Sequence, residues 1–149
     1  MEQIKIQNYE REHGAGTFIP FRSLTTGEAD HALGSVRQRL GLSDSSDALE
    51  VLRIIRDRSA LVEGVDAIDR GFDLGSVFSQ LNFGTAATAF VNWYRFDTID
   101  EVRTDDLCAI FGDLFYPSSD DIEIFDPGVN WLLSVGHNGS IWVLRTTAR

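Results

Sequence analysis

Apolar residues recur with a helical period between residues 26 and 40. They lie at i, i+4, i+7 and i+11, the spacing that places side chains on one face of an α-helix. Just before this segment, Thr25 and Glu28 have the spacing of a capping box, and Gly41 follows where a helix commonly ends. The pattern therefore predicts a helix over residues 26–40.

Two segments carry ambiguous signals. In residues 47–58, Asp47 and Glu50 are typical of a helix start, whereas the β-branched residues that follow favour a strand. We favour a helix that ends near Arg56. Residues 3–9 fit either a short strand or a helical turn, and the remainder of the first 24 residues shows no clear pattern.

Two more helices are predicted in the middle of the chain. Asp73 is a suitable N-cap for a short amphipathic helix that Gly84 would end. Residues 105–114 have apolar side chains along one side and predict another helix. This second segment contains Cys108, the single cysteine, which excludes an internal disulfide and a cysteine zinc cluster. We expect Cys108 to be a buried, inert thiol.

Three segments have the composition of β-strands. Residues 60–66 are the first predicted strand. Residues 88–96 are rich in β-branched and aromatic side chains and predict a central strand. In residues 121–125 acidic and apolar side chains alternate, and Pro127-Gly128 then predicts a turn.

The last part of the chain predicts a β-hairpin. Asn138-Gly139 is the residue pair that a two-residue type I′ turn prefers, and apolar runs flank it on both sides. Counting back from this turn gives one set of pairs on the face that we assign to the core: His137 with Ser140, Val135 with Trp142, Leu133 with Leu144, and Trp131 with Thr146. This register predicts that Trp142 is buried.

Together these elements indicate a single α+β domain. Strands and helices are mixed without regular alternation, which favours a mostly antiparallel sheet with three to four helices. The length of 149 residues is that of one ordinary domain, so we expect residues 1–149 to fold as one unit. The amino-terminal segment lacks an apolar leader, and no apolar run approaches membrane-spanning length. The sequence therefore predicts a soluble, cytoplasmic protein.

Negative charge is concentrated in one part of the sequence. The formal net charge is −10, and residues 97–126 hold ten carboxylates against the single cation Arg103. Such an excess is repelled by phosphates and by anionic lipid surfaces, so neither nucleic acid nor a membrane is an expected partner. If these carboxylates gather into one exposed patch, a basic protein is the natural partner.

Large aromatic side chains alternate with these carboxylates, a mixture that suits a protein interface. The alternative, that the aromatic residues are core and the acids only confer solubility, stays open. The predicted partner-binding residues are Asp100, Glu101, Asp105, Asp106, Asp113, Phe115, Tyr116, Asp120, Asp121 and Glu123.

Signals for catalysis or metal binding are weak. Asp121 and Glu123 project to the same side of a strand, but the calcium-loop pattern is missing, and we expect no metal and no cofactor. His137 faces Ser140 across the predicted hairpin, yet no Gly-x-Ser-x-Gly elbow occurs. We therefore expect no enzyme. A small hydrolase that uses His137 with Asp120 or Asp121 stays an alternative, as does a non-catalytic scaffold subunit.

The carboxy-terminal segment resembles a known group of proteins. Residues 114–126 read LFYPSSDDIEIFD, and Trp131 and His137-Asn138-Gly139 follow. This segment is similar to the tail of small acidic bacterial immunity proteins of polymorphic toxin and contact-dependent inhibition systems. The resemblance covers about the last 40 residues and assigns no residue roles. It implies an α+β protein that neutralises a cognate toxin, often a basic nuclease, by covering its active site or an adjoining surface.

Overall fold

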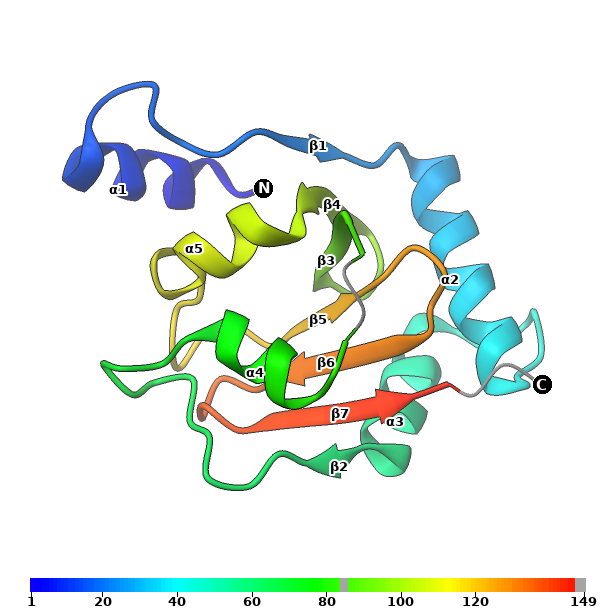
Figure 1. Cartoon of the computed structure of the whole chain (residues 1–149). Coiled ribbons are helices and arrows are strands. Elements are labelled where there is room, and N and C mark those ends of the chain that lie inside the picture. Colours follow the sequence, from blue (N-terminus) through cyan, green and yellow to red (C-terminus); the bar gives the residue numbers. More distant parts are fainter. Residues whose placement is uncertain (84–85, 147–149) are drawn as a thin grey trace.

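A seven-stranded antiparallel sheet forms the centre of the computed structural model, which describes residues 1–83 and 86–146 (Figure 1). The helices are α1 (Gln3–His13), α2 (Thr26–Leu40), α3 (Ala48–Arg58), α4 (Leu74–Gln80) and α5 (Thr104–Leu114). The strands are β1 (Phe21–Ser23), β2 (Ala60–Leu61), β3 (Thr88–Tyr94), β4 (Thr98–Arg103), β5 (Ile122–Phe125), β6 (Trp131–Val135) and β7 (Ile141–Arg145). Their order in the sheet is β1-β4-β3-β5-β6-β7-β2. The predicted α+β fold with a mostly antiparallel sheet is confirmed.

Helices cover both faces of this sheet. Helices α1, α4 and α5 lie in front of it in Figure 1, and α5 buries Leu107 and Phe111 in a core shared with Val91 and Ile124 of the strands. Helices α2 and α3 cover the opposite face and form a second core with side chains such as Phe125. Because each strand alternates between the two cores, the sheet is apolar on both sides along most of its length.

The helix signals in the sequence are confirmed where they were strongest. The Thr25 hydroxyl accepts a hydrogen bond from the backbone N–H of Glu28, whose carboxylate accepts one from the Thr25 N–H at 2.8 Å. Gly41 ends α2 with φ of 67°. Helix α3 resolves the ambiguous segment in favour of a helix, and Asp73 caps α4 as predicted. The proposed stop at Gly84 lies outside the described residues.

The structure has more helices than the sequence predicted, and one of the predicted strands is shorter. The ambiguous amino-terminal segment is the full helix α1, so the described residues contain five helices instead of three to four. The strand expected over residues 60–66 is reduced to the two residues of β2 at the sheet edge. Strand β3 ends at Tyr94, because Arg95 and Phe96 adopt positive φ in the turn to β4.

The hairpin is present, but the predicted register is wrong by one residue. Val135 pairs with Ile141 and Leu133 pairs with Val143. The loop contains three residues instead of two, because the Gly136 N–H bonds to the Ser140 carbonyl and only Gly139 of the loop has positive φ. A one-residue slip moves every side chain of a strand to the other face. Trp142 therefore lies opposite Ser134 and is only half-buried.

Within the described residues, no helix combines the length and apolar character that crossing a membrane requires.

Candidate partner-binding site

Two of the predicted partner-binding carboxylates, one fully buried and one largely buried, contact the amino-terminal segment. Asp100 is fully buried and accepts hydrogen bonds from the Ser23 hydroxyl at 2.5 Å and the Trp93 indole N–H at 2.7 Å. It also forms an ion pair with the amino group of Met1. Asp100 is therefore not available to a partner.

Asp120 forms the second of these contacts. The fully buried ammonium of Lys5 donates to the Asp120 carboxylate at 2.5 Å and to the Leu114 carbonyl at 2.7 Å. The same ammonium lies 3.9 Å from the centre of the Tyr116 ring. Burial of a lysine requires such a partner, because an unpaired charge in the interior is strongly destabilising. Asp120 and Tyr116 thus hold α1 on the fold.

Two further candidates also have internal partners. Glu101 forms an ion pair with Arg22 at 2.7 Å across strands β4 and β1. Phe115 is buried and stacks on Phe111 at 5.7 Å between ring centres, so it belongs to the core. Phe115 is therefore not available to a partner, whereas Glu101 is 26% exposed beside Arg22 and stays a predicted contact residue.

Glu123 lies in a polar row across the sheet. On the face covered by α2 and α3, it is flanked by Asn92 of β3 and Ser134 of β6. The Asn92 amide donates to its carboxylate at 2.7 Å. Removal from water raises the pKa of Glu123 to about 8, and the charge of Asp121 adds to this shift, against the opposing effects of Asn92 and Arg56. Glu123 is therefore mostly neutral at pH 7 and adds little to an anionic surface.

We expect Glu123 to make stability depend on pH in a recognisable way. Its pKa is higher in the folded chain than in the unfolded chain, so the folded state holds the proton more tightly. This contribution is fully present below the pKa of the unfolded chain and is lost as pH rises to about 8, with a slope of at most about 1.4 kcal/mol per pH unit. Urea unfolding of wild type and Glu123→Gln, at pH values from the pKa of the unfolded chain up to about 8, measures this contribution to stability. The difference in stability between the two proteins should change with pH in favour of Glu123→Gln as pH rises, and a constant difference would contradict the assignment.

His137 and Asp121 form an exposed pair. This is one of the two His–Asp pairs that the hydrolase alternative names. The His137 ring Nδ1 lies 3.0 Å from the Asp121 carboxylate, and their side chains are 59% and 55% exposed. The Ser140 hydroxyl donates instead to the Asn138 side chain at 2.6 Å. No hydrogen bond joins His137 to Ser140 in the part of the chain that the structure describes. The arrangement is an open surface pair and not the assembled nucleophile and base of a hydrolase.

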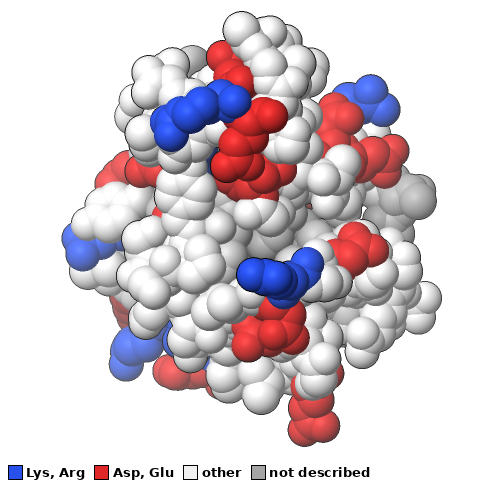
Figure 2. All heavy atoms as spheres, turned by 90° about the vertical axis from the view of Figure 1, so that its left-hand side faces the viewer, with Lys and Arg blue, Asp and Glu red and all other residues white. Residues whose placement is uncertain are grey.

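The ten carboxylates of residues 97–126 therefore do not form one patch. Figure 2 shows acidic side chains in separate groups on one end of the molecule, with basic side chains between several of them. Of the predicted partner-binding carboxylates, Asp105, Asp106 and Asp113 share one element, helix α5. Asp106 lies 3.9 Å from Arg103, and Asp113 lies 3.4 Å from His13.

Acidic charge does gather on one side of the fold, which we call the α4–α5 face and define as residues 63–80 and α5. Seven carboxylates and one cation, Arg70, lie in these two segments: Glu63, Asp66, Asp69, Asp73, Asp105, Asp106 and Asp113. Helices α2 and α3 on the opposite side carry four carboxylates and five arginines. The fold thus separates an acidic side from a nearly neutral one.

A pocket of about 470 Å³ opens on this face between the loop before α4 and α4 itself. Its lining combines the apolar side chains of Val65, Phe72 and Val77 with charged ones: Asp66, Asp69, Asp73 and Arg70. Hydrogen bonds from the Ser76 hydroxyl and the Gly75 N–H lower the pKa of Asp73, which keeps it ionised. A pocket that joins apolar side chains to three carboxylates and one cation, Arg70, suits the stem and charged head of an arginine or lysine side chain.

Sequence reasoning missed four members of this face. Glu63, Asp66, Asp69 and Asp73 recur every three to four residues, which was a usable signal, but their segment is separated in sequence from α5. Only the packing of α4 against α5 places the two segments together.

No family model, curated protein or solved structure matches this chain.

Proposed function

We propose that this protein is a cytoplasmic, non-enzymatic binding module that recognises a basic partner protein through the α4–α5 face. The observation that carries the proposal is the separation of charge between the two sides of the sheet. Seven carboxylates, with Arg70 in the same segments and Arg103 just before α5 as cations, create a local negative potential, whereas α2 and α3 offer none. Such a field attracts a basic protein and orients it before contact.

The resemblance of residues 114–139 to bacterial immunity proteins supplies the most specific form of this proposal. The partner would then be a toxin, such as a nuclease, whose cationic active-site groove or adjoining surface the protein covers. A nuclease groove is basic because it holds phosphates. Carboxylates on α5 and on the preceding loop can occupy the same groove.

The face retains part of the surface predicted from the sequence and replaces the rest. Asp105, Asp106 and Asp113 remain. Asp100, Asp120 and Phe115 are replaced by carboxylates of the loop before α4, which surround the pocket. In this arrangement one basic side chain of the partner enters the pocket and others meet the carboxylates of α5.

A pair of charge-matched variants tests the proposal on a partner captured from the native cell and identified by mass spectrometry. Asp69→Lys combined with Asp105→Lys reverses two exposed charges of the α4–α5 face, and Asp30→Lys with Asp57→Lys reverses two exposed charges on α2 and α3. Both variants have the same net charge. We expect the first to associate at least about tenfold more slowly at low salt, because steering depends on local charge.

The control should associate at close to the wild-type rate. Equal slowing of both variants would show that only net charge matters and would refute the assigned face. Inhibition of the captured partner's activity, measured with the same two variants, then tests whether binding neutralises it. Thermal unfolding of each variant verifies that the fold is intact.

A further inference from the structure

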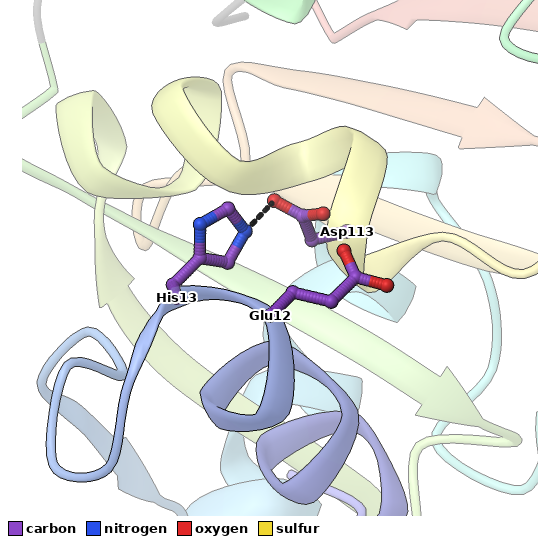
Figure 3. A group of neighbouring side chains, drawn as sticks. All are labelled: Glu12, His13 and Asp113. Atoms are coloured by element: carbon purple, nitrogen blue, oxygen red, sulfur yellow. Dashed lines mark ion pairs between the residues drawn. The ribbon is translucent and has the colours of Figure 1, made fainter.

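Three metal-ligating side chains meet where α1 and α5 end. Glu12 and His13 lie in the last turn of α1, and Asp113 lies in the last turn of α5 (Figure 3). Each offers one ligand atom, and these atoms all lie within 4.8 Å of one another. The side chains of His13 and Asp113 are 44% and 36% exposed, so an ion has access from solvent.

The distance between two of these atoms fits coordination of one ion. His13 Nε2 lies 3.4 Å from an Asp113 carboxylate oxygen. Two ligand atoms that each bind zinc at about 2.0–2.1 Å in a tetrahedral arrangement are roughly 3.3 Å apart. His13 and Asp113 therefore already have the separation that the ion requires. The Glu12 side chain is exposed, and its ligand atom lies within 4.8 Å of the other two, so a small side-chain movement completes the set.

Two features of the fold favour a cation at this place. The Tyr9 ring packs against the His13 imidazole, with 4.3 Å between ring centres, and so limits its orientation. Both helices direct their carboxyl-terminal ends here, and the partial negative charge of such ends attracts cations. Among the described residues, neither Glu12 nor Asp113 forms an ion pair with a lysine or arginine within 4.0 Å.

We propose that Glu12, His13 and Asp113 form a binding site for a zinc ion, which links α1 to α5. One imidazole nitrogen and two carboxylate oxygens are a donor set that zinc accepts, with water as the fourth ligand. Magnesium and calcium prefer oxygen donors alone, so the histidine selects against them. This site does not depend on the proposed binding of a basic partner.

The chain offers a matched control for this proposal. His137 is also exposed and also lies beside a carboxylate, Asp121, at 3.0 Å. Among the described residues it lacks the third ligand that Glu12 supplies to His13. A histidine and a single carboxylate bind zinc more weakly than three ligands do. His137→Ala should therefore leave zinc binding by Glu12, His13 and Asp113 unchanged.

Titration calorimetry of the full chain with zinc chloride, in a buffer that does not chelate metals, tests the site. We expect one zinc ion per chain in wild type, at least about tenfold weaker binding in His13→Ala and in Asp113→Asn, and unchanged binding in His137→Ala. Zinc should also raise the thermal midpoint of wild type and of His137→Ala, but not that of His13→Ala. All these side chains are exposed or half-buried, and circular dichroism of each variant verifies folding.

Three results would overturn the proposal. Absence of zinc binding to wild type is the first. Equal weakening in His13→Ala and His137→Ala is the second, since it would indicate adventitious binding by surface histidines. The third is binding of magnesium chloride as tight as that of zinc chloride, which would show that the imidazole takes no part.

Discussion

Replacement of Asp120 with alanine is expected to lower the free energy of unfolding by about 3–5 kcal/mol, as for other buried ion pairs that lose one partner. The reason is the fully buried ammonium of Lys5, which would lose its nearest carboxylate and keep the Leu114 carbonyl, the aromatic rings and the exposed Glu2 carboxylate at 3.7 Å. The variant would also lose the hydrogen bond from the Tyr116 N–H to Asp120. We expect α1 to separate from the fold at lower denaturant concentration than the sheet.

The neighbouring residue provides the control for this experiment. Asp121→Ala removes the same chemical group from an exposed position, and its cost should stay within about 1 kcal/mol. Urea unfolding measures both variants. Combining Lys5→Met with Asp120→Ala should recover part of the loss, because no charge is then left buried. Similar losses in Asp120→Ala and Asp121→Ala would contradict burial of the Lys5 pair.

Trp131→Ala is expected to cost about 3–5 kcal/mol, the range for large aromatic residues removed from a core. Trp131 is only 5% exposed. Its ring stacks on Phe83 with 4.3 Å between ring centres and contacts Phe78 edge-on at 5.2 Å. Truncation leaves a cavity between β6 and α4 that these rings cannot fill without moving.

The second hairpin tryptophan makes this prediction sensitive to register. Trp142 lies on the opposite face and is half-buried, so Trp142→Ala should cost distinctly less, about 1–2 kcal/mol. Denaturant unfolding of the two variants under one set of conditions gives the comparison. Losses in the reverse order would support the two-residue turn and the shifted pairing that it implies.

Helices were predictable where their signals are local. The capping box of Thr25 and Glu28, the Asp73 cap and the apolar period of α5 involve residues within a few positions of one another, and these helices form as predicted. For the segment of α1 the sequence fits either a short strand or a helical turn. Its capping position, Glu2, makes no side-chain cap hydrogen bond, and its one buried residue is the charged Lys5.

The site could not be predicted to the same extent, because the number of carboxylates in a segment does not show which of them are exposed to solvent. Asp100, Asp106 and Asp120 each stand next to another carboxylate in the sequence, so charge along the chain does not distinguish them. In the fold, Asp100 meets the Met1 amino group, Asp120 meets Lys5, and Asp106 stays partly exposed near Arg103. The cations that pair with the first two come from the opposite end of the chain.

The sequence by itself thus determined the fold class, most helices and the overall negative charge, since these depend on local propensity, periodicity and composition. The tertiary structure alone decided the hairpin register, the acidic α4–α5 face and the meeting of Glu12 and His13 with Asp113. The register depends on the three-residue loop and on which face of each strand the two cores bury, and the other two features depend on contacts between distant segments. The packing of the whole core determines such contacts, and a short segment of sequence does not contain the information to predict them.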